Sequence, residues 1–162
     1  MNKIILTDAE PEYNSDSDSL AKIVTMRLGL LPRKKGSTDY MHKILLQLYE
    51  KTKKATREKN PELAVMTVEE MAAFANITKQ TMYEYVDRWL QLEFISKVSF
   101  INSEKKVIKG YKLNGNTLED AFQKARIVVM KNLDTTQNYI QELQKLLKNE
   151  KIKASMNKNQ PI

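Results

Sequence analysis

The chain has 162 residues, of which 41% are hydrophobic and 29% charged, and it carries a formal net charge of +7 with an isoelectric point near 9.4. This length allows one domain, or one domain with appendages, that buries a core without covalent staples. The absence of cysteine excludes disulfides, zinc–thiolate sites and thiol catalysis, and the four scattered glycines form no phosphate-cradling loop.

The charge is distributed unevenly along the chain. Residues 1–19 contain one lysine and five acidic residues, a net charge of −4, so the remaining chain carries +11. A body this basic indicates a polyanionic partner, although abundant lysine also serves simply to keep a helical protein soluble. No apolar run approaches the roughly 18 residues of a membrane span, and the apolar core near Met1 is too short for a secretory signal. We therefore expect a cytoplasmic, nucleoid-associated protein with no membrane partner.

Two segments and a loop precede the first long helix. Residues 1–16 are acidic and polar and are predicted to form a flexible N-terminal arm. A helix is expected over about Leu20–Leu28, capped from within Ser17–Ser19 and unable to pass Pro32. The basic loop Arg33–Ser37 then either contacts phosphates or only links two helices.

The next helix is predicted from Thr38 to about Lys59, before Pro61. Its apolar residues follow the i, i+3, i+4, i+7 spacing of one helix face: Met41, Ile44, Leu45, Leu48 and Tyr49. His42 is the only histidine and lies in this helix, so it is expected to be a structural residue and not a ligand.

The segment Met66–Ile95 has the pattern of two helices joined by a tight turn. Thr67 and Glu70 have capping-box spacing at the start of the first helix. Asn76 suits the left-handed conformation that ends this helix, and Thr78 suits the cap of the second. The second helix is predicted to expose Lys79, Gln80, Thr81, Tyr83, Glu84, Asp87 and Arg88.

A basic hairpin is predicted directly after the second helix. The segments Phe94–Ile101 and Val107–Leu113 alternate apolar and polar residues around a polar tip. The hairpin carries one acidic residue, Glu104, against the lysines Lys97, Lys105, Lys106, Lys109 and Lys112.

The last predicted helix runs from Leu118 to about Lys151, after a second capping pattern at Thr117. Its apolar residues fall near a 3.5-residue repeat with a polar middle at Asn132 and Thr136. The helix either packs on its own domain or pairs with a second copy, and its length and repeat favour a coiled-coil homodimer. The predicted dimer interface comprises Leu118, Phe122, Ala125, Val129, Ile140 (or Tyr139), Leu143 and Leu147.

Three segments, Met66–Ala72, Ile77–Tyr83 and Trp89–Ile95, together with the hairpin, resemble the winged helix-turn-helix family of prokaryotic and archaeal transcription regulators of the MarR, PadR and TrmB kinds. The resemblance covers roughly residues 38–113. It implies a mainly α fold with a small β-hairpin wing and a long C-terminal helix. The chain departs from the family at Glu93, where glycine is usual.

The resemblance also implies how DNA would be bound. The second helix would enter the major groove, where Lys79 could donate to guanine and Gln80 could pair with adenine. Thr81 and Tyr83 would contact phosphate or a thymine methyl group, and Arg88 would hold a phosphate. The wing would contact phosphates or the minor groove through Lys97, Lys105, Lys106 and Lys109.

The predicted organisation is a flexible arm over 1–16, a winged helix-turn-helix domain over 17–116, a dimerisation helix over 117–151 and a disordered tail over 152–162. The expected function is that of a homodimeric, sequence-specific transcriptional regulator that binds double-stranded DNA. The alternatives are a DNA-binding protein of plasmid or chromosome replication, partition or organisation, and a winged-helix adaptor that binds protein. No constellation of an enzyme, metal site or cofactor site is recognisable in the sequence, so none is expected.

Overall fold

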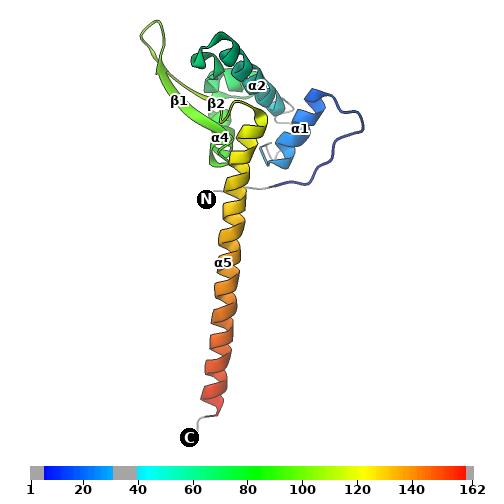
Figure 1. Ribbon diagram of the computed structural model, residues 1–162, viewed down its shortest axis with the longest axis vertical. Coiled ribbons are helices and arrows are strands. Elements are labelled where there is room, and N and C mark those ends of the chain that lie inside the picture. Colours follow the sequence, from blue (N-terminus) through cyan, green and yellow to red (C-terminus); the bar gives the residue numbers. More distant parts are fainter. Residues whose placement is uncertain (1–5, 31–39, 160–162) are drawn as a thin grey trace. The chain divides into compact units, whose positions relative to one another are not determined.

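The computed structural model describes residues 6–30 and 40–159 (Figure 1). The chain is mainly helical, with a two-stranded antiparallel hairpin and a long C-terminal helix. The elements are α1 (Ser17–Arg27), α2 (Met41–Glu58), the 3-10 helix η1 (Pro61–Ala64), α3 (Val68–Ala75), α4 (Lys79–Gln91), β1 (Ile95–Ile101), β2 (Val107–Leu113) and α5 (Leu118–Lys158). The chain divides into two compact units, residues 1–126 and 127–162, so the first unit extends ten residues beyond the predicted boundary at 116.

Helix α1 begins earlier than predicted because its cap is Asp16, whose carboxylate accepts a hydrogen bond from the Ser19 amide at 2.8 Å. The described part of the predicted flexible arm lies against the end of this helix. The Thr7 amide donates to the Arg27 carbonyl at 3.0 Å, and the Arg27 guanidinium lies 3.4 Å from the Asp8 carboxylate. The predicted basic loop Arg33–Ser37 falls outside the described residues.

The apolar face predicted for α2 forms the centre of the core. Met41, Ile44, Leu45 and Leu48 are all buried, together with His42. The His42 Nε2 lies 2.9 Å from the Asp18 carboxylate, so the histidine joins α2 to α1. His42 is therefore a core residue, whereas its position in the sequence left open whether it lies at the surface or in the core.

The caps predicted for the two short helices are confirmed. Thr67 Oγ1 accepts a hydrogen bond from the Glu70 amide at 3.2 Å at the start of α3, and Thr78 Oγ1 accepts one from the Thr81 amide at 3.2 Å at the start of α4. Asn76 ends α3 in the left-handed conformation, with φ of 55°. These contacts fix a three-residue turn between α3 and α4 and thereby the first residues that α4 exposes.

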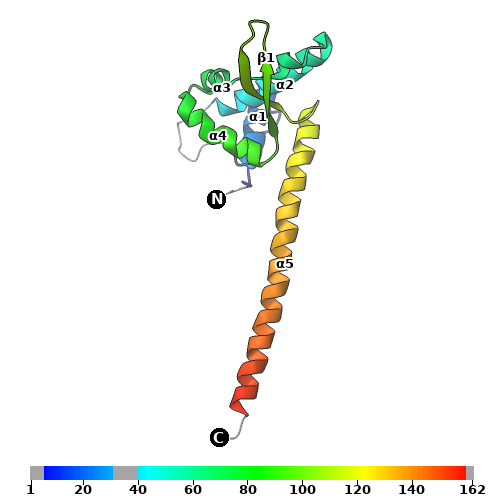
Figure 2. The same ribbon diagram turned by 90° about the vertical axis from the view of Figure 1, so that its left-hand side faces the viewer.

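The hairpin pairs every residue of β1 with one of β2, from Ile95 opposite Leu113 to Ile101 opposite Val107. Met66 forms an isolated antiparallel bridge with Tyr111 of β2. The Met66 amide donates to the Tyr111 carbonyl at 2.8 Å, and the Tyr111 amide donates to the Met66 carbonyl at 2.7 Å. This approach requires Gly110, since a Cβ there would lie 2.7 Å from the Met66 carbonyl oxygen. In both views the hairpin tip extends away from α4 (Figures 1 and 2).

Glu93 connects α4 to β1 in the left-handed conformation, with φ of 58°. This is the position at which the resembling family uses glycine, and the strand still begins at Ile95. A side chain in this conformation is strained by contact between its Cβ and the following carbonyl, whereas glycine is not.

Replacing Glu93 with glycine is therefore expected to raise the free energy of unfolding by about 0.5–1 kcal/mol. Urea denaturation followed by circular dichroism would measure the change. Glu84→Gly is the matched control because it removes the same side chain from the interior of α4, where glycine destabilises a helix by roughly 1 kcal/mol. Destabilisation by both substitutions would contradict the strain at position 93.

The first turns of α5 belong to the first compact unit. Ala121 and Ala125 are fully buried there. The Lys124 ammonium donates to the Asn114 carbonyl at 2.6 Å, and the Asn114 side-chain amide donates to the Glu93 carbonyl at 2.7 Å. The start of α5 is thus tied to the end of the hairpin and to the end of α4. Ala125 was predicted in the dimer interface, and this is corrected: a residue buried by its own chain offers no surface to a second copy.

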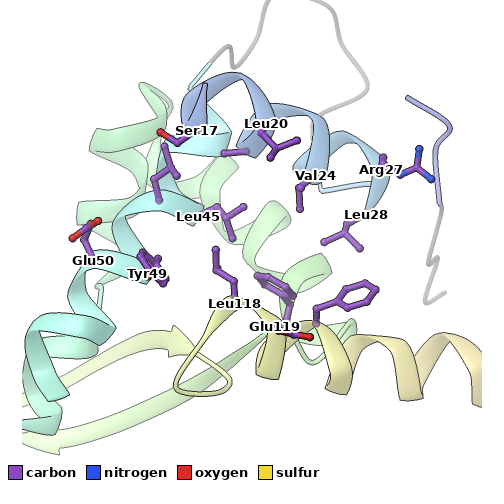
Figure 3. A pocket seen from close by; sticks show the side chains of 14 residues that line it. Ser17, Leu20, Val24, Arg27, Leu28, Leu45, Tyr49, Glu50, Leu118 and Glu119 are labelled. Atoms are coloured by element: carbon purple, nitrogen blue, oxygen red, sulfur yellow. The ribbon is translucent and has the colours of Figure 1, made fainter. Parts of the chain in front are cut away.

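The start of α5 also lines an apolar groove of about 650 Å³ with α1 and α2 (Figure 3). Leu20 and Val24 line it from α1, and Tyr49 lines it from α2. Leu118 and Phe122, both predicted in the dimer interface, line the same groove. The first apolar residues of the α5 repeat therefore line a groove within the first compact unit, although Phe122 remains 42% exposed.

The second compact unit contains the helical residues 127–158 of α5. The disordered tail predicted for residues 152–162 is corrected over 152–158, where the helix continues to Lys158, and residues 160–162 lie outside the described residues. No proline or glycine occurs between Gly115 and Pro161, so nothing in the sequence ends the helix at Lys151. The segment after Lys151 lacks an apolar stripe, but its lysines and alanine favour helix on their own.

Candidate nucleic-acid interface

The outward side of α4 presents the residues that the sequence singled out at its N-terminus. Lys79, Gln80 and Tyr83 are exposed. Thr81 is only partly exposed, and its hydroxyl accepts a hydrogen bond from Thr78 Oγ1 at 2.8 Å, within the cap of the helix. Three of the four proposed reading side chains are thus exposed, while the hydroxyl of the fourth is hydrogen-bonded within the cap of the helix.

Lys79 has a partner that sequence reasoning missed. Its ammonium lies 2.6 Å from the Glu69 carboxylate, which is in the first turn of α3. The hydrogen bond from Lys79 lowers the pKa of Glu69, and the hydrogen bond to Glu69 raises the pKa of Lys79, so both groups are charged at neutral pH. The pair crosses the turn between the two helices, and no helix-period rule connects residues ten positions apart.

Tyr83 lies one helical turn after Lys79 on α4 and is 48% exposed. In β2, burial raises the pKa of the Tyr111 phenol, and the negative charge that Tyr83 would carry when ionised is a second, smaller cause of this rise.

The strand register shows which predicted wing lysines share the face of Tyr111. Lys97 is directly opposite Tyr111, and Lys109 precedes Tyr111 by two residues, so these three side chains point to the same face. Lys112 pairs with Ser96 and points to the other face. Both Lys97 and Lys109 are exposed. The hairpin face that bears Tyr111 thus carries two cationic side chains.

The remaining wing lysines lie at the hairpin tip. Lys105 and Lys106 are both exposed. The Lys106 ammonium lies 3.8 Å from the carboxylate of Glu104. An ion pair this exposed is weak, so Lys106 stays available to an anionic partner.

The polar side chains in the later turns of α4 make more contacts within the helix than the sequence indicated. The Arg88 guanidinium lies 5.5 Å from the centre of the Tyr85 ring, in a stacking contact within the helix, and the residue is only partly exposed. Asp87 accepts a hydrogen bond from the side chain of Gln91 at 2.8 Å. The acidic and basic residues of these turns are therefore engaged locally, and the most accessible polar surface is the N-terminal part of α4.

A second surface of interest lies on the 127–158 part of α5. Apolar residues recur there at alternating four- and three-residue steps, interrupted only by Thr136: Val129, Leu133, Ile140, Leu143 and Leu147. The last four are more than half exposed. Leu133 was missed from the sequence because the polar Asn132 was taken as the interface position in that turn. We call these residues the α5 stripe.

In the part of the chain that the structure describes, no group of three or more histidine, cysteine, aspartate or glutamate residues could hold a metal ion. Likewise, within residues 6–30 and 40–159, no helix is both long and apolar enough to cross a lipid bilayer.

Comparison of the chain with protein-family models, with curated proteins and with solved structures found no match. The assignment of a function therefore depends on the chain's own residues and their arrangement.

Proposed function

We propose that this chain is a sequence-specific, double-stranded DNA-binding protein with a winged helix-turn-helix fold, acting as a homodimeric transcriptional regulator. One observation carries the proposal. Lys79 and Gln80 are exposed at the N-terminus of α4, and the hairpin that follows α4 exposes Lys97 and Lys109 on one face. The chain thus presents both polar groups suited to base edges and cations suited to phosphates.

The division of roles follows from the chemistry of each group. Gln80 offers both a donor and an acceptor, as needed for adenine N6 and N7, and Lys79 donates to guanine O6 and N7. The ammonium groups of the hairpin would contact phosphates, which position a protein on the duplex without reading its sequence. The net charge of +7 adds a general attraction to DNA.

The α5 stripe supports the homodimer in this proposal. A helix of 41 residues is about 60 Å long, and an exposed apolar row at a 3.5-residue repeat is the pattern that pairs in a coiled coil. Thr136 would be the one polar residue that interrupts the repeat of the stripe. Two paired chains would present two copies of α4 to a two-fold symmetric DNA site.

The test is a titration of duplex DNA at several salt concentrations. If Lys97, Lys105, Lys106 and Lys109 each neutralise one phosphate, the logarithm of the association constant should fall with the logarithm of salt with a slope of roughly −3 to −4 per protomer. A pool of random duplexes, selected over several rounds, should converge on a preferred sequence with two-fold symmetry.

Salt-dependent binding without any preferred sequence would favour a protein that organises DNA over a regulator. Absence of binding at low salt would refute both, and would leave the protein-binding adaptor.

A further inference from the structure

The contact between Glu69 and Lys79 joins the two helices on either side of the turn. Glu69 is in the first turn of α3, and Lys79 is the first residue of α4. The carboxylate oxygen lies 2.6 Å from the ammonium nitrogen, and the side chains are 60% and 53% exposed. An ion pair this exposed adds little to stability. Its consequence lies in what Lys79 can bind.

We propose that Glu69 is a specificity-determining residue of the DNA interface, which positions Lys79 to donate to the edge of guanine and disfavours its use on phosphate. This inference rests on the proposed DNA-binding function. It adds a role for an acidic residue, on the helix before the reading helix, within a surface that otherwise recognises an anion.

The donor geometry of the pair permits such a role. An ammonium group has three hydrogens, and the contact with Glu69 occupies one of them. Two donors remain for the two acceptors, O6 and N7, that guanine presents in the major groove.

The negative charge of Glu69 makes binding of Lys79 to a phosphate less favourable than binding of Lys79 to a base edge. A phosphate bound to Lys79 would be placed beside the Glu69 carboxylate, and the two negative charges would repel each other. The guanine edge is neutral and accepts hydrogen bonds without this repulsion. In addition, a lysine that is already paired displaces fewer counterions from DNA than a free lysine.

The neighbouring Glu70 provides a matched control. It lies in the same turn of α3 and carries the same charge, but its carboxylate is 3.6 Å from Lys51 of α2 and not beside Lys79. Glu69→Gln and Glu70→Gln each remove one negative charge and so raise the net charge of the protein by one. Any difference between the two variants therefore reports the contact with Lys79 and not the net charge.

The experiment measures the affinity of each variant for a selected duplex and for a random duplex, over a range of salt. Glu69→Gln should bind random DNA about 3- to 10-fold more tightly and bind the selected duplex with little change, so the ratio of the two affinities falls. Its salt slope on random DNA should steepen by about one, because Lys79 becomes free to neutralise a phosphate. Glu70→Gln should keep the wild-type ratio.

A double-mutant cycle isolates the pair. In a Lys79→Ala background, Glu69→Gln should no longer differ from Glu70→Gln. Equal behaviour of the two glutamine variants in the wild-type background would overturn the inference while leaving DNA binding intact. Weaker binding of Glu69→Gln to both duplexes would also overturn it. Failure of the wild-type protein to bind DNA at low salt would refute the proposed function, and the inference with it.

Discussion

Replacing Lys79 and Gln80 together with alanine is expected to lower the affinity for a selected duplex by at least about 30-fold, because each well-aligned contact with a base edge contributes roughly 1–3 kcal/mol of discrimination. Binding to random DNA should fall only a few-fold. Both side chains are exposed at the N-terminus of α4, and neither belongs to the core. The loss should therefore appear in binding and not in the unfolding temperature.

Fluorescence anisotropy with a selected duplex and a random duplex would measure both affinities at one fixed salt concentration. The matched control is Lys105→Ala with Lys109→Ala, which also removes two exposed side chains, but from the hairpin. This control should weaken binding to both duplexes by the same factor, since phosphate contacts carry no sequence information. If Lys79→Ala with Gln80→Ala also weakened binding to both duplexes by the same factor, α4 would not be the helix that reads the DNA sequence.

The caps and turns of this fold could be predicted because they depend on neighbouring residues. Thr67 and Thr78 cap their helices through contacts three residues away, and Asn76 takes the left-handed conformation for reasons local to its own side chain. The hairpin, though not its register, was predicted from alternation along two adjacent segments. The caps depend on contacts within a few residues in the sequence, and the hairpin joins two segments that are neighbours along the chain.

The contacts that shape the candidate interface are of another kind. The pair Glu69–Lys79 depends on how α3 and α4 cross in space. No periodicity along the chain encodes such crossings. The sequence indicated which side chains α4 exposes, but not that Lys79 would be paired with Glu69 of α3.

Helix α5 shows why an apolar repeat alone does not identify its partner. The same spacing includes Ala125, which is buried by its own chain, and Leu143, which is exposed. Small side chains allow a helix to approach its own domain closely, so Ala121 and Ala125 pack in cis. Periodicity measures only which residues share a face, and burial distinguishes the part already covered from the part still available.

The α5 stripe is the part of this repeat that remains exposed. Replacing Leu143 with aspartate should make the protein monomeric, because it places a carboxylate near the centre of the α5 stripe, opposite the same carboxylate of a paired copy. An uncompensated buried charge costs roughly 3–5 kcal/mol, so the dissociation constant of the dimer should rise at least about 100-fold. Light scattering at several protein concentrations would measure the mass.

Asn138→Asp is the matched control for this substitution. It introduces the same carboxylate on the same helix, but about half a turn away from the α5 stripe, where a paired copy would not cover it. This variant should keep the mass of the wild-type protein. A wild-type protein that is already monomeric, or a dimer that survives Leu143→Asp, would show that the stripe does not pair in the proposed way.

Loss of the dimer should also be visible in DNA binding. Two α4 helices held in one particle bind two half-sites with an avidity that exceeds single binding by roughly 10²- to 10⁴-fold. Leu143→Asp should therefore lose most of its affinity for a selected duplex with two half-sites, while binding to a duplex with one half-site stays as in the wild type. This difference separates a dimer that reads DNA from a dimer that only stabilises the chain, because in the second case both duplexes would bind the variant as well as they bind the wild type.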